Sequence, residues 1–307
     1  MRLRTSLLVF AGAILAIASA ELTLRAVEEH LPVLSDWPTV ETEVKSAQFA
    51  RLEENPELLI VGSSMVESAV DPHALVSMGA ASSAYNSAFP FSTPAAMDIW
   101  LRDYLRPWDG LEVVVIGLPA WPPPADLASD PLATGLIEAF GADLVADPFE
   151  DVALWRLRGL LADLGEATRR ERTVAAGLWT ELGHQTVYYG RSAGSLVGRF
   201  PPYGEPEMSE VQERGLRRIV ATARQAGATP VVLLEAGRFP GVVDDRTVAA
   251  YLDTLYELTA DLDVPLWDAY SLDWDESLYA DEVHFNEEGA RAFTAYLGAL
   301  LDLLGGG

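Results

Sequence analysis

Two segments far apart in the sequence carry side chains suited to acyl-transfer chemistry. Gly62-Ser63-Ser64 follows a run of strand-forming apolar residues, and a second segment contains Asp281 and His284. A serine hydroxyl is a weak nucleophile unless an imidazole takes its proton, and the imidazole works best when a carboxylate fixes its tautomer. Ser64, His284 and Asp281 could fill these three roles. One turn of backbone can bring Asp281 and His284 together, because they are three residues apart.

Each of these residues also has a purely structural interpretation. A serine that follows a strand often caps the next helix, because its oxygen accepts a free N–H of the first turn. This alternative applies to both Ser63 and Ser64. His284 could likewise cap a helix that starts near Asn286, with Asp281 in a turn.

The pattern of predicted strands and helices explains how such distant residues could meet. Short apolar runs predict strands at 58–62, 84–88, 111–118, 229–236 and 264–267, and helices are predicted after Ser64 and over 94–105, 207–227, 247–262 and 287–304. This alternation predicts an α/β fold with a parallel sheet. Ligands of such sheets bind beyond the carboxyl ends of the strands, the edge where Ser64, Asn86, Asp281 and His284 are expected. Asp71-Pro72 is expected to end the first helix and to leave His73 in a loop.

The two segments resemble the first and last sequence blocks of the SGNH/GDSL hydrolase superfamily. The residues that carry the resemblance are Gly62-Ser63-Ser64 and Asp281-x-x-His284-x-Asn286-x-x-Gly289. They are most similar to the membrane-tethered, extracytoplasmic branch, which includes proteins resembling the D-alanine transfer protein of teichoic acids and the alginate O-acetylation proteins. The resemblance covers roughly residues 58–118 and 229–304. It implies a three-layer, flavodoxin-like parallel sheet of the SGNH hydrolase type.

The resemblance also implies an activity and a role for each residue. Ser64, rather than Ser63, would be the nucleophile of an exported serine esterase or O-acyltransferase, with His284 as base and Asp281 orienting it. The substrate would be an acyl ester, most simply an acetyl ester, of a cell-surface carbohydrate. A multi-span membrane acyltransferase is an expected partner, and no cofactor or metal is needed.

Two blocks depart from the family pattern. The second block, Asn86-Ser87-Ala88, lacks the usual glycine, and the third, 117–121, lacks the usual asparagine. The expected oxyanion donors are therefore the Ser64 backbone N–H and Asn86. The same departures motivate an alternative: a catalytically silent protein of this fold that binds glycan or a partner in polysaccharide modification.

The N-terminal segment has the pattern of an export signal. Arg2 and Arg4 precede an apolar run over residues 7–20. Ala18-Ser19-Ala20 favours cleavage as a signal peptide, whereas the resemblance favours a retained single-span anchor over 1–24. Both interpretations place the domain outside the cell membrane. A stalk and lead-in helix are expected over 25–57, followed by a catalytic domain over 58–307 with a helical insertion at 119–206.

Composition excludes several other functions. The chain of 307 residues has 46 acidic and 21 basic residues and a net charge of −25, which argues against a nucleic-acid partner. It contains no cysteine, so thiol catalysis and cysteine-bound zinc are excluded. Its four histidines are not at ligand spacing, and a histidine-rich metal site is not expected.

Overall fold

The computed structural model describes only part of the chain. The described residues are 45, 48–49, 51–52, 54–90, 92–103, 110–122, 180–186, 189, 208–237, 245–281 and 283–305. The predicted export signal at 1–24, most of the stalk and most of the insertion at 119–206 lie outside them. No helix within the described residues is long and apolar enough to cross a membrane.

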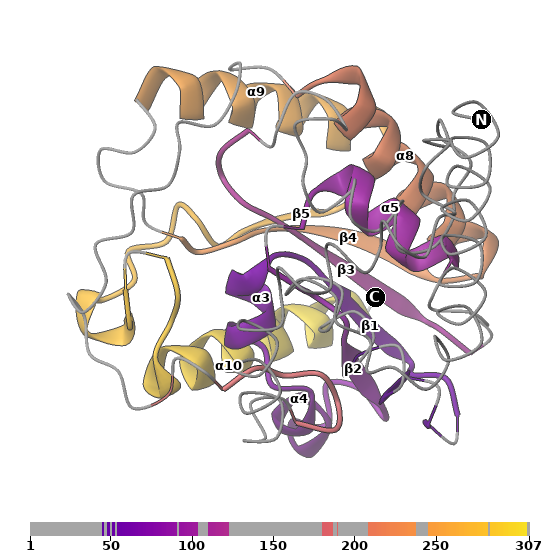
Figure 1. Ribbon diagram of the computed structural model, residues 1–307, viewed down its shortest axis with the longest axis vertical. Helices are drawn as coiled ribbons and strands as arrows, with labels where there is room; N and C mark the ends of the chain where they lie inside the picture. Colours follow the sequence, from indigo (N-terminus) through magenta and orange to yellow (C-terminus); the bar gives the residue numbers. More distant parts are fainter. Residues whose placement is uncertain are drawn as a thin grey trace, which may run out of the picture.

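The described residues form one parallel sheet of five strands, as predicted (Figure 1). The strands are β1 (Leu58–Val61), β2 (Ala84–Asn86), β3 (Val113–Leu118), β4 (Thr229–Leu234) and β5 (Leu266–Asp268). Their order is β2-β1-β3-β4-β5, and every neighbouring pair is parallel. This is the flavodoxin-like order, in which the chain reverses direction across the sheet between β1 and β3.

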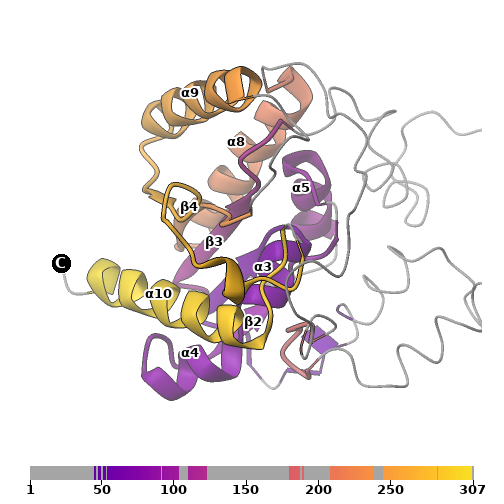
Figure 2. The same ribbon diagram turned by 90° about the vertical axis from the view of Figure 1, so that its left-hand side faces the viewer.

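Helices cover both faces of the sheet and give three layers (Figure 2). One face carries α3 (Ser64–Ala69), α4 (Pro72–Met78) and α10 (Glu287–Gly305), and the other carries α5 (Pro94–Asp103), α8 (Glu210–Gln225) and α9 (Asp245–Asp261). A short 3-10 helix, η1 (Glu276–Leu278), precedes α10. The predicted α/β architecture is therefore confirmed for the described residues.

The apolar runs form strands because both faces of the sheet are buried. On the α5, α8 and α9 side, the core includes Trp100 and Tyr251. On the other side it includes Val66, Phe293 and Leu297. The central strand β3 contributes to both clusters, so its sequence is apolar without alternation, as is typical of parallel sheets.

The prediction that His73 lies in a loop is wrong, because His73 belongs to the helix α4. Pro72 is the first residue of α4, and the Asp71 side chain caps that helix by accepting a hydrogen bond from the His73 N–H at 2.9 Å. Proline suits this position because its fixed φ is helical and the first turn needs no N–H from it. The proline therefore starts a second helix immediately after α3 ends.

Candidate active site

Ser63 and Ser64 have different positions at the carboxyl end of β1. Ser63 is the N-cap of α3, and its hydroxyl oxygen accepts a hydrogen bond from the Met65 N–H at 3.2 Å. Ser64 is the first helical residue. The capping interpretation therefore applies to Ser63, whereas the Ser64 hydroxyl lies where the sheet order reverses, the usual ligand-binding crevice of such folds.

The loop that carries Asp281 and His284 is held by its own backbone. Asp281 Oδ1 accepts hydrogen bonds from the N–H groups of Val283 at 2.9 Å and His284 at 2.8 Å. The Ala280 N–H donates to the His284 carbonyl at 2.8 Å. This tight turn places His284 Nδ1 2.9 Å from Asp281 Oδ2 and 3.0 Å from Oδ1.

The start of α10 is capped by Asn286, so the alternative in which His284 caps this helix is wrong. Asn286 Oδ1 accepts hydrogen bonds from the N–H groups of Glu288 and Gly289, each at 3.0 Å. A Cβ atom at Gly289 would lie 2.2 Å from the Leu278 carbonyl oxygen. Glycine therefore allows the helix to approach the loop that leads to His284.

The structure brings Ser64, His284 and Asp281 into one chain of polar contacts. Ser64 Oγ lies 2.9 Å from His284 Nε2, although 220 positions separate the two residues. His284 is 7% exposed. Because a carboxylate only accepts, Nδ1 must carry the hydrogen that faces Asp281, and Nε2 then presents its lone pair to the Ser64 hydroxyl. This is the orientation needed to remove the serine proton.

The charge of Asp281 is stabilised within the same turn. Burial alone would raise the pKa of Asp281, but the hydrogen bond and charge of His284 and two backbone N–H groups outweigh it and lower this pKa below its ordinary value. Asp281 therefore contributes stability that is present above its unfolded pKa and is lost as pH falls through the lowered folded pKa. The carboxylate is the form that His284 meets at neutral pH.

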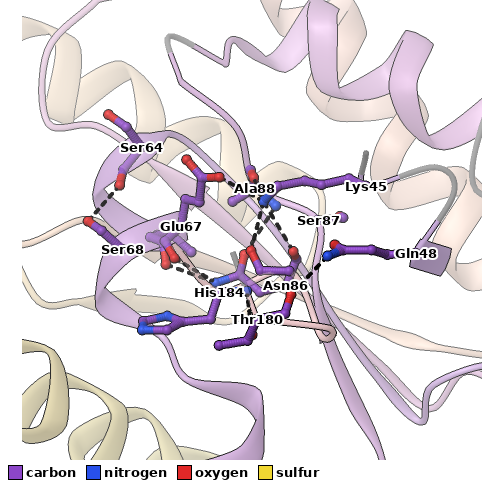
Figure 3. A network of polar contacts seen from close by, with 12 residues as sticks. Lys45, Gln48, Ser64, Glu67, Ser68, Asn86, Ser87, Ala88, Thr180 and His184 are labelled. Atoms are coloured by element: carbon purple, nitrogen blue, oxygen red, sulfur yellow. Dashed lines mark hydrogen bonds and ion pairs between the residues drawn. The ribbon is translucent and has the colours of Figure 1, made fainter. Parts of the chain in front are cut away.

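Asn86, expected to bind an oxyanion, contacts the carboxyl-terminal end of α3 instead (Figure 3). Its amide nitrogen donates to the carbonyls of Val66 at 3.1 Å, Glu67 at 3.3 Å and Val70 at 2.9 Å, and its side chain is fully buried. These carbonyls lie in the last turn of α3 and at its C-cap, Val70, where helix carbonyls run out of N–H partners within the helix. The amide hydrogens of Asn86 therefore bind the carbonyls at the end of α3, and Asn86 stabilises this helix.

A buried ion pair joins the lead-in segment to the same helix. Lys45 Nζ lies 2.9 Å from Glu67 Oε1, and both side chains are 0% exposed. Lys45 also donates to the carbonyls of Asn86 at 3.3 Å, of Gly183 at 3.0 Å, and of Ala88. Sequence analysis missed this role. The one available signal was that Lys45 is the only lysine in the chain.

Replacing Lys45 with methionine is expected to destabilise the domain by about 3–5 kcal/mol, because it leaves the Glu67 carboxylate buried without its cation. Urea unfolding at neutral pH would measure the change. Arg217→Met is a matched control, since Arg217 pairs with Glu213 at 2.8 Å with both side chains about 40% exposed; it should cost less than about 1 kcal/mol. Equal effects for the two variants would contradict the importance of the buried pair.

Glu235, directly after β4, is a second residue near the site that sequence analysis did not identify. Its Oε1 accepts a hydrogen bond from the Ser63 N–H at 2.9 Å, and its Oε2 accepts one from the Ser63 hydroxyl at 2.6 Å. The side chain is buried, with 1% of the residue exposed. A single acidic residue at the end of the apolar run 231–236 was the signal that could have identified it.

Possible metal ligands are not clustered in the described part of the chain. No group of three or more histidine, aspartate or glutamate side chains there is arranged to hold a metal ion. The contacts at the carboxyl ends of β1 and β4 and in the 281–284 turn join two serines, one imidazole and two carboxylates.

Comparisons with known proteins found no matching family model and no matching curated protein. Among solved structures, the chain is similar to a protein provisionally named a platelet activating factor from Streptococcus pneumonia, with 10% identity, a TM-score of 0.47, and coverage of 95% of this chain and 99% of that chain. It is also similar to a carbohydrate acetylesterase family member from Sinorhizobium meliloti, with 13% identity, a TM-score of 0.39, and coverage of 81% and 99%. A third, provisionally named an arylesterase from Agrobacterium tumefaciens, has 14% identity, a TM-score of 0.36, and coverage of 80% and 97%. Similarities this low carry no argument, so the fold and the site rest on the geometry of this chain.

Proposed function

We propose that this protein is a serine esterase or O-acyltransferase in which Ser64 is the nucleophile, His284 the general base and Asp281 the residue that orients His284. The observation that carries this proposal is the contact of Ser64 Oγ with His284 Nε2 at 2.9 Å, continued by the contact of Nδ1 with Asp281 at 2.9 Å. A nucleophile, a base and an orienting carboxylate in hydrogen-bonded series are the recurring arrangement of acyl-transfer sites.

The first half-reaction forms an acyl-enzyme. His284 Nε2 takes the Ser64 proton as Ser64 Oγ attacks the ester carbonyl carbon, and the carbonyl oxygen becomes an oxyanion. Collapse of this intermediate breaks the bond to the alcohol, which leaves with the proton returned by His284. Asp281 stabilises the imidazolium that forms between these two proton transfers.

The second half-reaction repeats these steps with a new acceptor. His284 takes a proton from water or from a carbohydrate hydroxyl, whose oxygen attacks the acyl-enzyme carbonyl. The acyl group leaves Ser64, and His284 returns the proton to the serine oxygen. The same three side chains serve both acceptors, so esterase and acyltransferase differ only in which hydroxyl enters the site.

The backbone N–H of Ser64 is assigned as the hydrogen-bond donor to the oxyanion. Ser64 is the first residue of α3, and the first N–H groups of a helix have no partner within it. A donor aimed at the developing charge is often the largest contribution to acyl transfer. Asn86 is not assigned this role, because α3 uses its amide hydrogens.

The proposed substrate is an acyl ester of a cell-surface carbohydrate, and the proposed location is outside the cell membrane. Arg2, Arg4 and the apolar run 7–20 support export, either with a retained span or after cleavage. The family resemblance supports the carbohydrate substrate and a multi-span membrane acyltransferase as partner.

A fluorophosphonate probe tests the proposed nucleophile directly. Ser64 Oγ should attack phosphorus and release fluoride, and peptide mapping of the modified wild-type chain should place the probe on Ser64. A panel of short acyl esters and acetylated oligosaccharides, assayed in parallel, should show turnover. Modification of Ser63, or no modification of either serine, would contradict the assignment.

The position of Asn86 favours one second candidate, a catalytically silent protein that binds an acylated glycan. In that case, the described site would lack a side-chain donor for the oxyanion. A glycan that raises the unfolding temperature without being deacylated, together with no probe modification, would favour this function over catalysis.

A further inference from the structure

The Glu235 carboxyl reaches the turn that carries the nucleophile from two strands away. Glu235 follows β4, whereas Ser63 follows β1, and β3 lies between these strands. A Cβ atom at Gly117 on β3 would lie 2.7 Å from Glu235 Oε1, and one at Gly62 would lie 2.9 Å from it. The absence of side chains at these two strand ends therefore makes room for the carboxyl group.

We infer that Glu235 is a positioning residue for the nucleophile: its carboxylate fixes the backbone and hydroxyl of Ser63, and through them the place of Ser64. This inference rests on the proposed function. Glu235 contacts Ser63 and does not take part in bond making or breaking. It acts by holding the residue that both precedes Ser64 and caps α3.

The hydrogen bonds of Ser63 match the charged form of Glu235. The Ser63 N–H and hydroxyl both donate to the carboxylate, at 2.9 and 2.6 Å, while the hydroxyl oxygen accepts from the Met65 N–H. A distance of 2.6 Å is typical of a hydroxyl that donates to a charged carboxylate. If Glu235 were protonated, one of its oxygens would become a donor, and the Ser63 hydroxyl would lose its acceptor.

The environment of Glu235 moves the pKa of its carboxyl group into the neutral range. Burial raises the pKa of Glu235 to about 7, against the opposing effect of its two hydrogen bonds from Ser63. From α9, the titratable group that faces it is Tyr251, whose own pKa is raised by burial and by the Glu235 charge, so Tyr251 stays neutral. From β3, Gly117 lies beside its carboxyl group, and the Leu118 carbonyl accepts a hydrogen bond from the Glu235 N–H at 2.9 Å.

The sign of the effect on folding follows from this pKa. Because the folded value lies above the ordinary 4.5, the folded protein binds the Glu235 proton more tightly than the unfolded chain. Its contribution to stability is greatest below about pH 4.5 and declines as pH rises to about 7. Glu235→Gln should remove this decline, which corresponds to about a 300-fold change in the unfolding equilibrium constant.

The decisive experiment compares kcat and KM of the wild type, Glu235→Gln, Ser63→Ala and the double variant from pH 5 to pH 9 on a short acyl ester. Glutamine can still accept from the Ser63 N–H but presents a donor to the Ser63 hydroxyl. In Glu235→Gln and in Ser63→Ala we expect kcat to fall about 10- to 100-fold relative to the wild type, with KM nearly unchanged, because a small displacement of the nucleophile affects the chemical step. The double variant should lose no more than either single variant.

The pH profile separates positioning from a merely structural role. In the wild type, log kcat/KM should fall further on the acid side, because protonation of Glu235 near pH 7 removes the acceptor of the Ser63 hydroxyl. In Glu235→Gln this additional decline should be absent. Glu257→Gln, on the exposed surface of α9, is the matched control and should keep the wild-type profile.

Each outcome is decisive. Wild-type kinetics and an unchanged acid limb in both Glu235→Gln and Ser63→Ala would overturn the positioning role alone. An inactive wild type whose Ser64 is not modified by a fluorophosphonate would overturn the proposed function, and the positioning role with it. If Glu235→Gln fails to fold by circular dichroism, Ser63→Ala carries the test, because it keeps the Glu235 hydrogen bond from the Ser63 N–H.

Discussion

Replacing Ser64 with alanine is expected to lower kcat/KM for acyl esters by about 10⁴- to 10⁶-fold and to abolish fluorophosphonate modification. The methyl group has no oxygen to form the acyl-enzyme, and His284 Nε2, 2.9 Å from Ser64 Oγ in the wild type, then has no proton to take. Residual turnover would reflect hydrolysis by water near the remaining N–H donor. Initial rates and probe stoichiometry measure the two effects.

Ser77→Ala is the matched control for this substitution. Ser77 lies on the exposed surface of α4, away from the strand ends that form the site, and its loss should leave turnover and modification unchanged. Substantial turnover in Ser64→Ala, or modification at the wild-type level, would remove Ser64 as the nucleophile. Ser63 would then be the serine to examine, since it is adjacent in the sequence.

Replacing Asp281 with asparagine is expected to lower kcat by about 10⁴-fold while KM changes little. The asparagine oxygen can still accept from the Val283 and His284 N–H groups, so the turn should keep its shape. The amide NH₂, however, would face His284 Nδ1 and force that nitrogen to accept. The imidazole hydrogen would move to Nε2, which could then no longer take the Ser64 proton.

Asp253→Asn, on the exposed surface of α9, removes the same charge far from the site and should retain wild-type rates. Thermal unfolding of both variants would verify that each is folded under the assay conditions. A kcat within tenfold of the wild type for Asp281→Asn would show that the tautomer of His284 does not depend on this carboxylate.

Sequence patterns predicted the features that depend on residues near one another in the chain. The continuous apolar run of β3 predicted a strand buried on both faces, and the parallel order of strands placed Ser64 and His284 at one edge. The spacing of Asp281 and His284 anticipated their contact because three residues form a single turn. Each of these inferences needs only local geometry and the rule that parallel strands share a carboxyl edge.

Features that depend on tertiary packing could not be predicted in this way. The amide of Asn86 could have faced a ligand or the end of α3, and only the packing of β2 beneath α3 decides between them. Lys45 and Glu67 look like ordinary surface residues in the sequence, yet each is buried because the other is present. Glu235 fell within a predicted strand, and its hydrogen bonds to Ser63 cross an intervening strand.

The 220 positions between Ser64 and His284 also determine when the site can exist during biosynthesis. A ribosome that has produced most of the polypeptide has released the serine but has not yet supplied its proton acceptor. Packing of α10 against α3 and α4 completes the arrangement only after α10 has emerged. A nascent or truncated product without this segment would lack the contact between Ser64 and His284, and under the proposed function it would be inert toward acyl esters.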